Sequence, residues 1–191
     1  NPQKAKEHFK KIIEIDFNYK DAHNNLGAVF ENLGENLKAI SCFEKAIKID
    51  PNSINANYNL ANLLKKLEEF KKAISFYEKV IKIDPKNIES QYNLGISLKE
   101  LRENQKAISC FEKVIEINPN HLKAHCNVAE IYKQLGEYSK AINFYEKSII
   151  IDPNNEQLYN SMGNSFSRLG EKQKAINCYE KAIEISPNYV N

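Results

Sequence analysis

Asparagine recurs at a fixed interval along this 191-residue chain, and a side-chain amide is well suited to hold a peptide backbone. Asn25, Asn59, Asn93 and Asn127 are each 34 residues apart, and Ser161 stands at the next step. A carboxamide offers one acceptor and two donors, so it can pair with the C=O and the N–H of an extended peptide of any sequence. Such amides also cap helices or bridge adjacent ones. The spacing therefore predicts either a peptide-binding row or an internal bridge.

Tyrosine and lysine accompany the asparagines at the same interval. Tyr58 and Tyr92 would add apolar area and a hydroxyl to a binding surface, or else stack on neighbouring helices. A basic row is formed by Lys65, Lys99 and Lys133, to which Lys123 and Arg168 add. Such a row suits acidic or phosphorylated partner segments, although most charge rows are only solvated faces. The residues predicted to bind a peptide are Asn25, Tyr58, Asn59, Asn62, Lys65, Tyr92, Asn93, Lys99, Lys123, Asn127, Lys133, Asn160 and Asn164.

Groups that could carry catalysis or bind a metal are sparse. His121 and His125 have the four-residue spacing of two ligands on one helix face, but no third ligand accompanies them. The sequence has no glycine-rich phosphate loop, no Cys-x-x-Cys and no nucleophile elbow. We therefore predict no enzyme active site, no metal site and no cofactor in these residues, and a catalytic domain elsewhere in the parent chain stays open.

The charge balance argues against two classes of partner. The chain has 27 basic and 25 acidic residues, a net charge of +2, with lysine and glutamate interleaved, so it lacks the basic footprint of a nucleic-acid binder. The longest purely apolar run, Ile149-Ile150-Ile151, is far shorter than the roughly 20 residues needed to span a bilayer. We predict neither a nucleic-acid nor a membrane partner.

The cysteines point to a reducing compartment. Cys42, Cys110 and Cys178 are 68 residues apart, which in a stacked array exceeds the roughly 7 Å Cα separation of a disulfide, and Cys126 is out of phase with them. Four reduced thiols favour an intracellular, cytoplasmic location. The chain opens Asn-Pro-Gln rather than with Met, so we expect it to be a piece of a longer protein.

The elements that must position these residues follow from the same period of 34. A proline follows Ile-Asp, Ile-Asn or Ile-Ser at that interval from Pro51 to Pro187, and a fixed period of this size indicates a repeat array. With residue 20 as repeat position 1, the predicted units are 20–53, 54–87, 88–121, 122–155 and 156–189, in one continuous solenoid domain with residues 1–19 as the second helix of a preceding partial repeat and 190–191 as a tail.

Each unit is predicted to contain two helices of about 13–14 residues. Apolar or small residues at positions 7, 8 and 11, such as Leu26, Gly27 and Phe30, have helical spacing. Ala39 and Phe43, at positions 20 and 24, begin a second amphipathic pattern. Small residues at positions 8 and 20 let the two helix axes approach closely, and the proline ends the second helix because the residue before it is pushed out of the α region.

The turn between the two helices is predicted at position 15. Glycine stands there as Gly34, Gly136 and Gly170, where a helix end needs a residue that tolerates positive φ. Glu68 and Arg102 replace glycine in the other two units, at a cost of about 1 kcal/mol if the same backbone angle is kept.

These motifs resemble the tetratricopeptide repeat throughout residues 20–189, with a matching second helix in 1–19. The resemblance implies an all-α fold, a right-handed superhelical solenoid of helix-turn-helix repeats whose first helices line a concave groove. The chain departs from the family at position 4, where the family often has Trp, and polar residues there suggest looser packing. Those residues are His23, Asn57, Gln91, His125 and Tyr159.

Within that resemblance, the asparagine row is similar to the ladder of O-GlcNAc transferase superhelices, which holds peptide main chain. The two-carboxylate clamp that some family members use for chaperone tails is excluded, because no unit has Lys at position 5 or Arg at position 6. The resemblance implies a non-catalytic scaffold that binds an extended or helical segment of a protein or peptide partner, one of acidic character if the basic row takes part.

Three alternatives to the scaffold stay open. Uncovered apolar ends, including Ile176, Tyr179 and Ile183, would let copies stack end to end as a homo-oligomer. The array could also be the substrate-targeting arm of a glycosyltransferase. RNA recognition is the most distant, because helical repeats that bind RNA use more basic surfaces.

Overall fold

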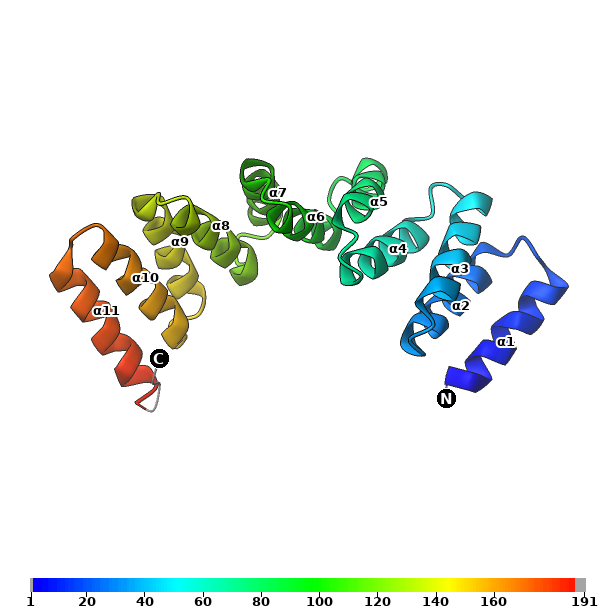
Figure 1. Ribbon diagram of the computed structural model, residues 1–191, viewed down its shortest axis with the longest axis horizontal. Coiled ribbons are helices and arrows are strands. Elements are labelled where there is room, and N and C mark those ends of the chain that lie inside the picture. Colours follow the sequence, from blue (N-terminus) through cyan, green and yellow to red (C-terminus); the bar gives the residue numbers. More distant parts are fainter. Residues whose placement is uncertain (1, 188–191) are drawn as a thin grey trace. The chain divides into compact units, whose positions relative to one another are not determined.

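The computed structural model describes residues 2–187, which form eleven α-helices and no strand (Figure 1). The predicted tail 190–191 lies outside the described residues. The helices are α1 (Pro2–Ile15), α2 (Lys20–Asn32), α3 (Asn36–Ile49), α4 (Ile54–Lys66), α5 (Phe70–Ile83), α6 (Ile88–Glu100), α7 (Asn104–Ile117), α8 (Leu122–Gln134), α9 (Tyr138–Ile151), α10 (Glu156–Arg168) and α11 (Lys172–Ile185). The predicted all-α fold and the helix lengths are confirmed, since first helices have 13 residues and second helices 14.

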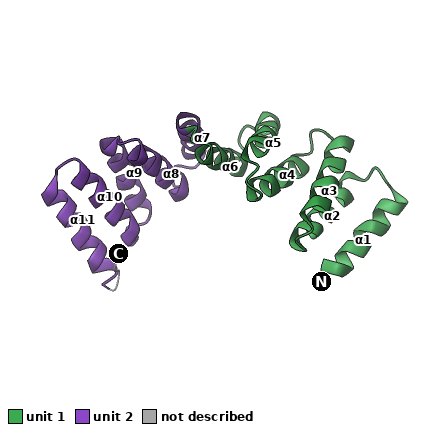
Figure 2. Cartoon of the chain, in the orientation of Figure 1, with its two compact units in different colours: residues 1–103 green, residues 104–191 purple. Residues whose placement is uncertain are grey.

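The chain divides into two compact units, residues 1–103 and residues 104–191 (Figure 2). The border falls between α6 and α7, inside the predicted repeat 88–121. One continuous solenoid domain, with repeat borders from 20–53 to 156–189, stays a prediction.

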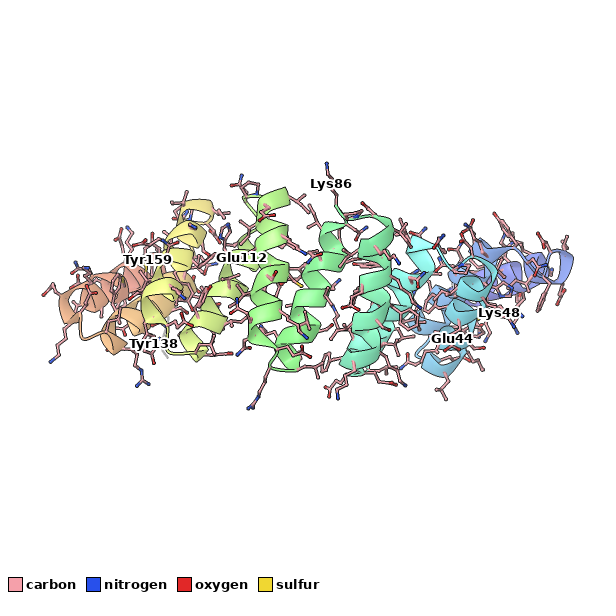
Figure 3. All side chains as sticks on the ribbon, turned by 90° about the horizontal axis from the view of Figure 1, so that it is seen from above. Glu44, Lys48, Lys86, Glu112, Tyr138 and Tyr159 are labelled. Carbon is pink, nitrogen blue, oxygen red and sulfur yellow. The ribbon has the colours of Figure 1, made fainter. Side chains whose placement is uncertain are left out.

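Unit 1 is built from α1 to α6 in two layers. Each helix packs on the next one in the chain, and α4 also contacts both α2 and α6. The first helices α2, α4 and α6 therefore follow one another in one layer, and the second helices α1, α3 and α5 form the other (Figure 1). The second helices carry exposed charges such as Glu44 and Lys48 on α3, and Lys86 projects from the turn before α6 (Figure 3).

Unit 2 is built from α7 to α11 by the same rule of neighbour packing. Its core contains Ala129, Ala141, Tyr145 and Leu158 between α8, α9 and α10, and a second cluster follows between α9, α10 and α11. The first helices α8 and α10 are separated along the chain by α9, which packs on both of them.

The helix ends form where the sequence predicted them. Helix α3 ends at Ile49, and Asp50 before Pro51 is extended, with φ −134° and ψ 96°. All five residues at position 15 have positive φ, between 59° and 78°, including the non-glycine residues Glu68 and Arg102. The turn geometry is thus imposed by helix packing, which overrides the unfavourable residue type at two of its five occurrences.

Small residues at positions 8 and 20 bring the two helices of a repeat together, as predicted. On α3 the side chains of Ala39 and Phe43 are fully buried. A Cβ built on Gly27 would lie 2.6 Å from Cε1 of Phe43, so the aromatic ring packs directly against the glycine backbone. Any side chain at Gly27 would require Phe43 to move.

Four of the five polar residues at position 4 are buried and Tyr159 is partly exposed, so the expectation of looser packing was wrong at those four. His23 Nε2 donates to Phe17 O (2.8 Å), Asn57 Nδ2 to Pro51 O (3.1 Å) and His125 Nε2 to Pro119 O (2.9 Å). In each case the acceptor is the carbonyl six residues earlier, at position 32 of the preceding repeat. A polar side chain therefore satisfies a carbonyl of the turn between repeats.

Candidate peptide-binding surface

In unit 1 the predicted asparagine row bridges adjacent first helices. Asn59 Nδ2 on α4 donates to Asn24 Oδ1 on α2 (3.0 Å), and Asn93 Nδ2 on α6 donates to the hydroxyl of Tyr58 on α4 (3.2 Å). In both cases a position 6 amide donates to the position 5 side chain of the preceding repeat. The bridging alternative thus describes part of what these amides do within this unit.

Asn62 is the centre of a larger polar cluster on the same helices. Its Oδ1 accepts from the hydroxyl of Tyr77 (2.6 Å) and from Asn93 Nδ2 (3.3 Å). Tyr77 is fully buried, and burial, with a smaller effect of Tyr58, raises its pKa far above the usual value for tyrosine, so its hydroxyl stays a donor. The rings of Tyr58 and Tyr77 meet edge to face, with centroids 6.2 Å apart.

Lys65 also belongs to this polar cluster. Its Nζ donates to Asn93 Oδ1 (2.7 Å), and burial lowers the pKa of this lysine. Asn93 therefore uses both ends of its amide within the protein: Nδ2 toward Tyr58 and Asn62, and Oδ1 toward Lys65. Both donor positions of Asn93 Nδ2 are thus used within the protein, so a ligand that accepts from this amide must displace Tyr58 or Asn62.

Two amide groups on α4 can still hydrogen bond to a ligand. Among the described residues, Oδ1 of Asn59 accepts no hydrogen bond, and Nδ2 of Asn62 makes none. Residues three apart on a helix are neighbours on its surface, and both side chains are partly exposed. One acceptor and one donor side by side match the N–H and the C=O of a peptide main chain.

In unit 2 the corresponding positions are occupied differently. Asn127 Nδ2 donates to Lys123 O of its own helix (2.8 Å). Glu130 holds position 9 of α8, where its Oε2 accepts from the hydroxyl of Tyr145 (3.2 Å) and pairs with Lys133 Nζ (2.6 Å). The acidic side chain therefore takes the place that Asn62 has in unit 1.

The other predicted binding residues lie on first helices with varied exposure. Asn25 on α2 and Lys123 on α8 are exposed, and Tyr92 and Lys99 on α6 and Asn160 on α10 are partly exposed. Their role in binding stays a prediction.

Sequence analysis missed the tyrosines at position 24 that orient the polar residues at position 9. Tyr77 bonds to Asn62, Tyr145 to Glu130, and the hydroxyl of Tyr179 to Asn164 Oδ1 (2.9 Å), always across 15 residues. The signal was present in the sequence. Position 24 is tyrosine in the repeats where position 9 is polar, and phenylalanine, as Phe43 and Phe111, where position 9 is Ala28 or Ile96.

The two histidines with metal-ligand spacing both have structural partners. His121 Nδ1 accepts from the backbone N–H of Ala124 (3.1 Å) and so caps α8, while His125 is buried on the carbonyl of Pro119. Within residues 2–187, no three His, Cys, Asp or Glu side chains lie together where they could hold a metal ion. The described helices also include none with the length and apolarity needed to cross a bilayer.

Comparison with known proteins settles the family. The family model of the tetratricopeptide repeat matches residues 21–53, 54–87, 88–121, 122–155 and 157–189. This chain belongs to the tetratricopeptide repeat family. Members of the family bind protein or peptide partners. No curated protein matches the sequence of this tetratricopeptide repeat chain.

Solved structures of other tetratricopeptide repeat proteins resemble this one closely. The crystal structure of MamA has a TM-score of 0.84 and 27% sequence identity, covering 88% of this chain and 92% of that one. YrrB, described as a tetratricopeptide repeat protein with an unusual peptide-binding site, has a TM-score of 0.82 and 23% identity, covering 95% of this chain and 93% of its own. MamA from Desulfovibrio magneticus RS-1 has a TM-score of 0.80 and 18% identity, covering 90% and 97%.

Proposed function

We propose that this chain is a non-catalytic scaffold that holds an extended peptide on the first-helix face of unit 1. The observation that carries the proposal is the pair of unfilled amide groups on α4, Oδ1 of Asn59 and Nδ2 of Asn62, held in place by bonds to Asn24 and Tyr77. Because the surrounding hydrogen bonds fix these amides before a ligand arrives, little ordering entropy opposes association.

The partner's main chain supplies the contacts to this pair. Asn59 accepts from a peptide N–H and Asn62 donates to a peptide C=O, so recognition of the backbone is independent of its sequence. Tyr58, partly exposed beside them, adds apolar area, and Lys65 and Lys99 on the same face favour acidic side chains. The similarity of the amide row to that of O-GlcNAc transferases belongs to this proposal and predicts the same main-chain recognition.

An intracellular location suits this scaffold. All four cysteines are free thiols, and burial raises the pKa of Cys42, Cys126 and Cys178. A raised pKa keeps these groups as thiols, which are less reactive than thiolates.

Substitution of the two α4 asparagines should weaken binding of a peptide selected on this chain from a displayed random library. Asn59→Ala removes the acceptor, and Asn62→Asp keeps an oxygen for the Tyr77 hydroxyl but removes the donor. Each loss costs about 1–2 kcal/mol, or roughly 5- to 30-fold in Kd by isothermal titration calorimetry.

Matched controls come from Asn143, which is exposed on α9 in unit 2. Asn143→Ala and Asn143→Asp carry the same changes in composition and charge, and both should leave Kd within about twofold. Equal losses at α4 and at Asn143 would reject the proposed site.

Self-assembly is the second candidate, favoured by the exposed face of α11. Ile176 and Ile183 on this helix are 47% and 57% exposed, and apolar surface of this kind suits stacking on a second copy. Sedimentation equilibrium distinguishes the two functions: assembly requires a concentration-dependent mass that Ile176→Gln with Ile183→Gln abolishes.

The glycosyltransferase alternative stays a prediction. It is decided by whether the full gene product carries a transferase domain.

A further inference from the structure

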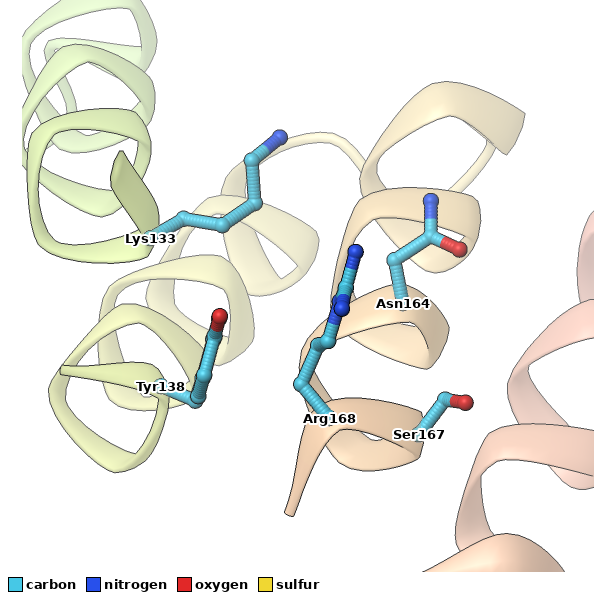
Figure 4. A pocket seen from close by; sticks show the side chains of 5 residues that line it. All are labelled: Lys133, Tyr138, Asn164, Ser167 and Arg168. Carbon is cyan, nitrogen blue, oxygen red and sulfur yellow. The ribbon is translucent and has the colours of Figure 1, made fainter. Parts of the chain in front are cut away.

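Unit 2 contains a polar hollow at the C-terminal ends of its two first helices. Its volume is about 610 Å³, and its lining residues come from α8, α10 and the start of α9 (Figure 4). We call it the basic pocket. Its lining residues are Lys133, Tyr138, Asn164, Ser167 and Arg168.

Four of these side chains direct hydrogen-bond donors to one side of the pocket. In Figure 4 the nitrogen ends of Lys133, Asn164 and Arg168 and the hydroxyl of Tyr138 point the same way. The orientation of Asn164 is held by Tyr179, whose hydroxyl donates to Oδ1 (2.9 Å) and leaves Nδ2 as the free end. The pocket therefore combines two cationic groups with two neutral donors.

The charge of the pocket is only partly compensated. Lys133 Nζ pairs with Glu130 Oε2 (2.6 Å), and that carboxylate also accepts from Tyr145 and Gln134. Arg168 has no acidic partner among the described residues. Two positive charges and one negative charge leave an excess of +1, carried by a guanidinium that is exposed and available to an anion.

We propose that the basic pocket binds a phosphate monoester, as carried by a phosphorylated side chain of the peptide partner. A guanidinium matches two phosphate oxygens at once, while Lys133, Asn164 and Tyr138 supply donors for the third. A phosphate monoester has three acceptor oxygens and a charge of about −1.5 to −2 at pH 7, so it uses this donor set more fully than a carboxylate with two oxygens and one charge. That the phosphate is carried by a peptide rests on the proposed function, whereas binding of a phosphate monoester in the pocket does not.

The two arginines of the sequence make the test direct. Only Arg102 and Arg168 contribute Nε–Hε resonances, so a ¹⁵N-labelled sample of the 191-residue chain reports on the pocket and on a control site in one spectrum. Titration with phenyl phosphate should shift the Arg168 resonance in a saturable way and leave Arg102 unchanged. Benzoate, which has the same ring and a carboxylate, should bind at least about tenfold more weakly.

Two variants that keep Arg168 test the charge balance around it. Lys133→Gln removes a charged donor and should raise the Kd for phenyl phosphate about tenfold. Glu130→Gln removes the opposing carboxylate, releases Lys133, and should lower Kd severalfold. Circular dichroism of each variant checks that the helices are retained.

Several results would overturn the proposal. They are a shift that does not saturate, equal shifts at Arg102 and Arg168, benzoate binding as tightly as phenyl phosphate, or an unchanged Kd in both folded variants. Phenyl phosphate has no peptide bond, so failure of backbone recognition at Asn59 leaves this titration unaffected.

Whether the bound phosphate is carried by a peptide can be tested by comparing a library-selected peptide made with and without one phosphoserine. Binding at least tenfold tighter with phosphoserine, lost in Arg168→Gln, supports a phosphorylated peptide. Equal binding of the two peptides by a chain that takes up phenyl phosphate would overturn the peptide part of the proposal.

Discussion

Replacing Asn57 by aspartate is expected to lower the free energy of unfolding by about 3–5 kcal/mol at pH 7, because it places an uncompensated charge in the core. Asn57 is fully buried, and its Nδ2 donates to the carbonyls of Pro51 (3.1 Å) and Ser53 (2.8 Å). In Asn57→Asp the size is kept, but the donor becomes an oxygen that faces two carbonyl oxygens. The loss can be measured by urea denaturation followed by circular dichroism.

The pH dependence of that loss identifies its cause. Burial disfavours the ionised form, so the pKa of the new carboxyl group in the folded state lies above its unfolded value of about 3.9. The folded state then binds more protons than the unfolded state, and stability falls as pH rises above about 3.9. Relative to the parent chain, the penalty should shrink toward pH 4, where the protonated acid can donate to a carbonyl.

Asn57→His is the matched control, since His23 and His125 already fill position 4 and donate to the equivalent carbonyls. It should cost less than about 1.5 kcal/mol. A penalty for Asn57→Asp that is small, or that does not change with pH, would contradict the role given to this carbonyl contact.

Replacing Phe43 by alanine is expected to cost about 3–5 kcal/mol of stability. The ring is fully buried and lies directly against Gly27, which has no side chain to fill the space that the ring would leave. Leu37→Ala on the same helix is the control, because Leu37 is 84% exposed and should change stability by less than about 0.5 kcal/mol. Comparable losses for the two variants would show that Phe43 is not a core residue.

The fold could be predicted in detail because its determinants are local and repeated. Helix ends depend on a proline or on position 15, and small residues such as Gly27 and Ala39 lie where helices approach. Even the left-handed backbone at Glu68 follows from its place in the period. Five copies of one pattern reinforce each prediction.

The hydrogen bonds of the candidate site were less predictable than the fold. A repeat period specifies the helix face on which a residue lies, but it does not specify the side chain to which that residue bonds. The 34-residue spacing puts Asn59 and Asn93 on the same face, yet Asn59 bonds to an amide and Asn93 to a phenol and an ammonium group. An amide has two ends, and several polar side chains of the neighbouring repeat lie within its reach. The link from Tyr77 to Asn62 was readable in principle, through the residue types that change together at positions 9 and 24.

Main-chain recognition by Asn59 can be tested most directly with an N-methyl scan of the selected peptide. Methylating one backbone nitrogen removes one N–H, and a double-mutant cycle with Asn59→Ala isolates the contact between that N–H and Oδ1. We expect one position where N-methylation weakens binding to the parent chain about tenfold but leaves binding to Asn59→Ala unchanged, a coupling of about 1.4 kcal/mol. Losses that are the same in both proteins at every position would contradict the account.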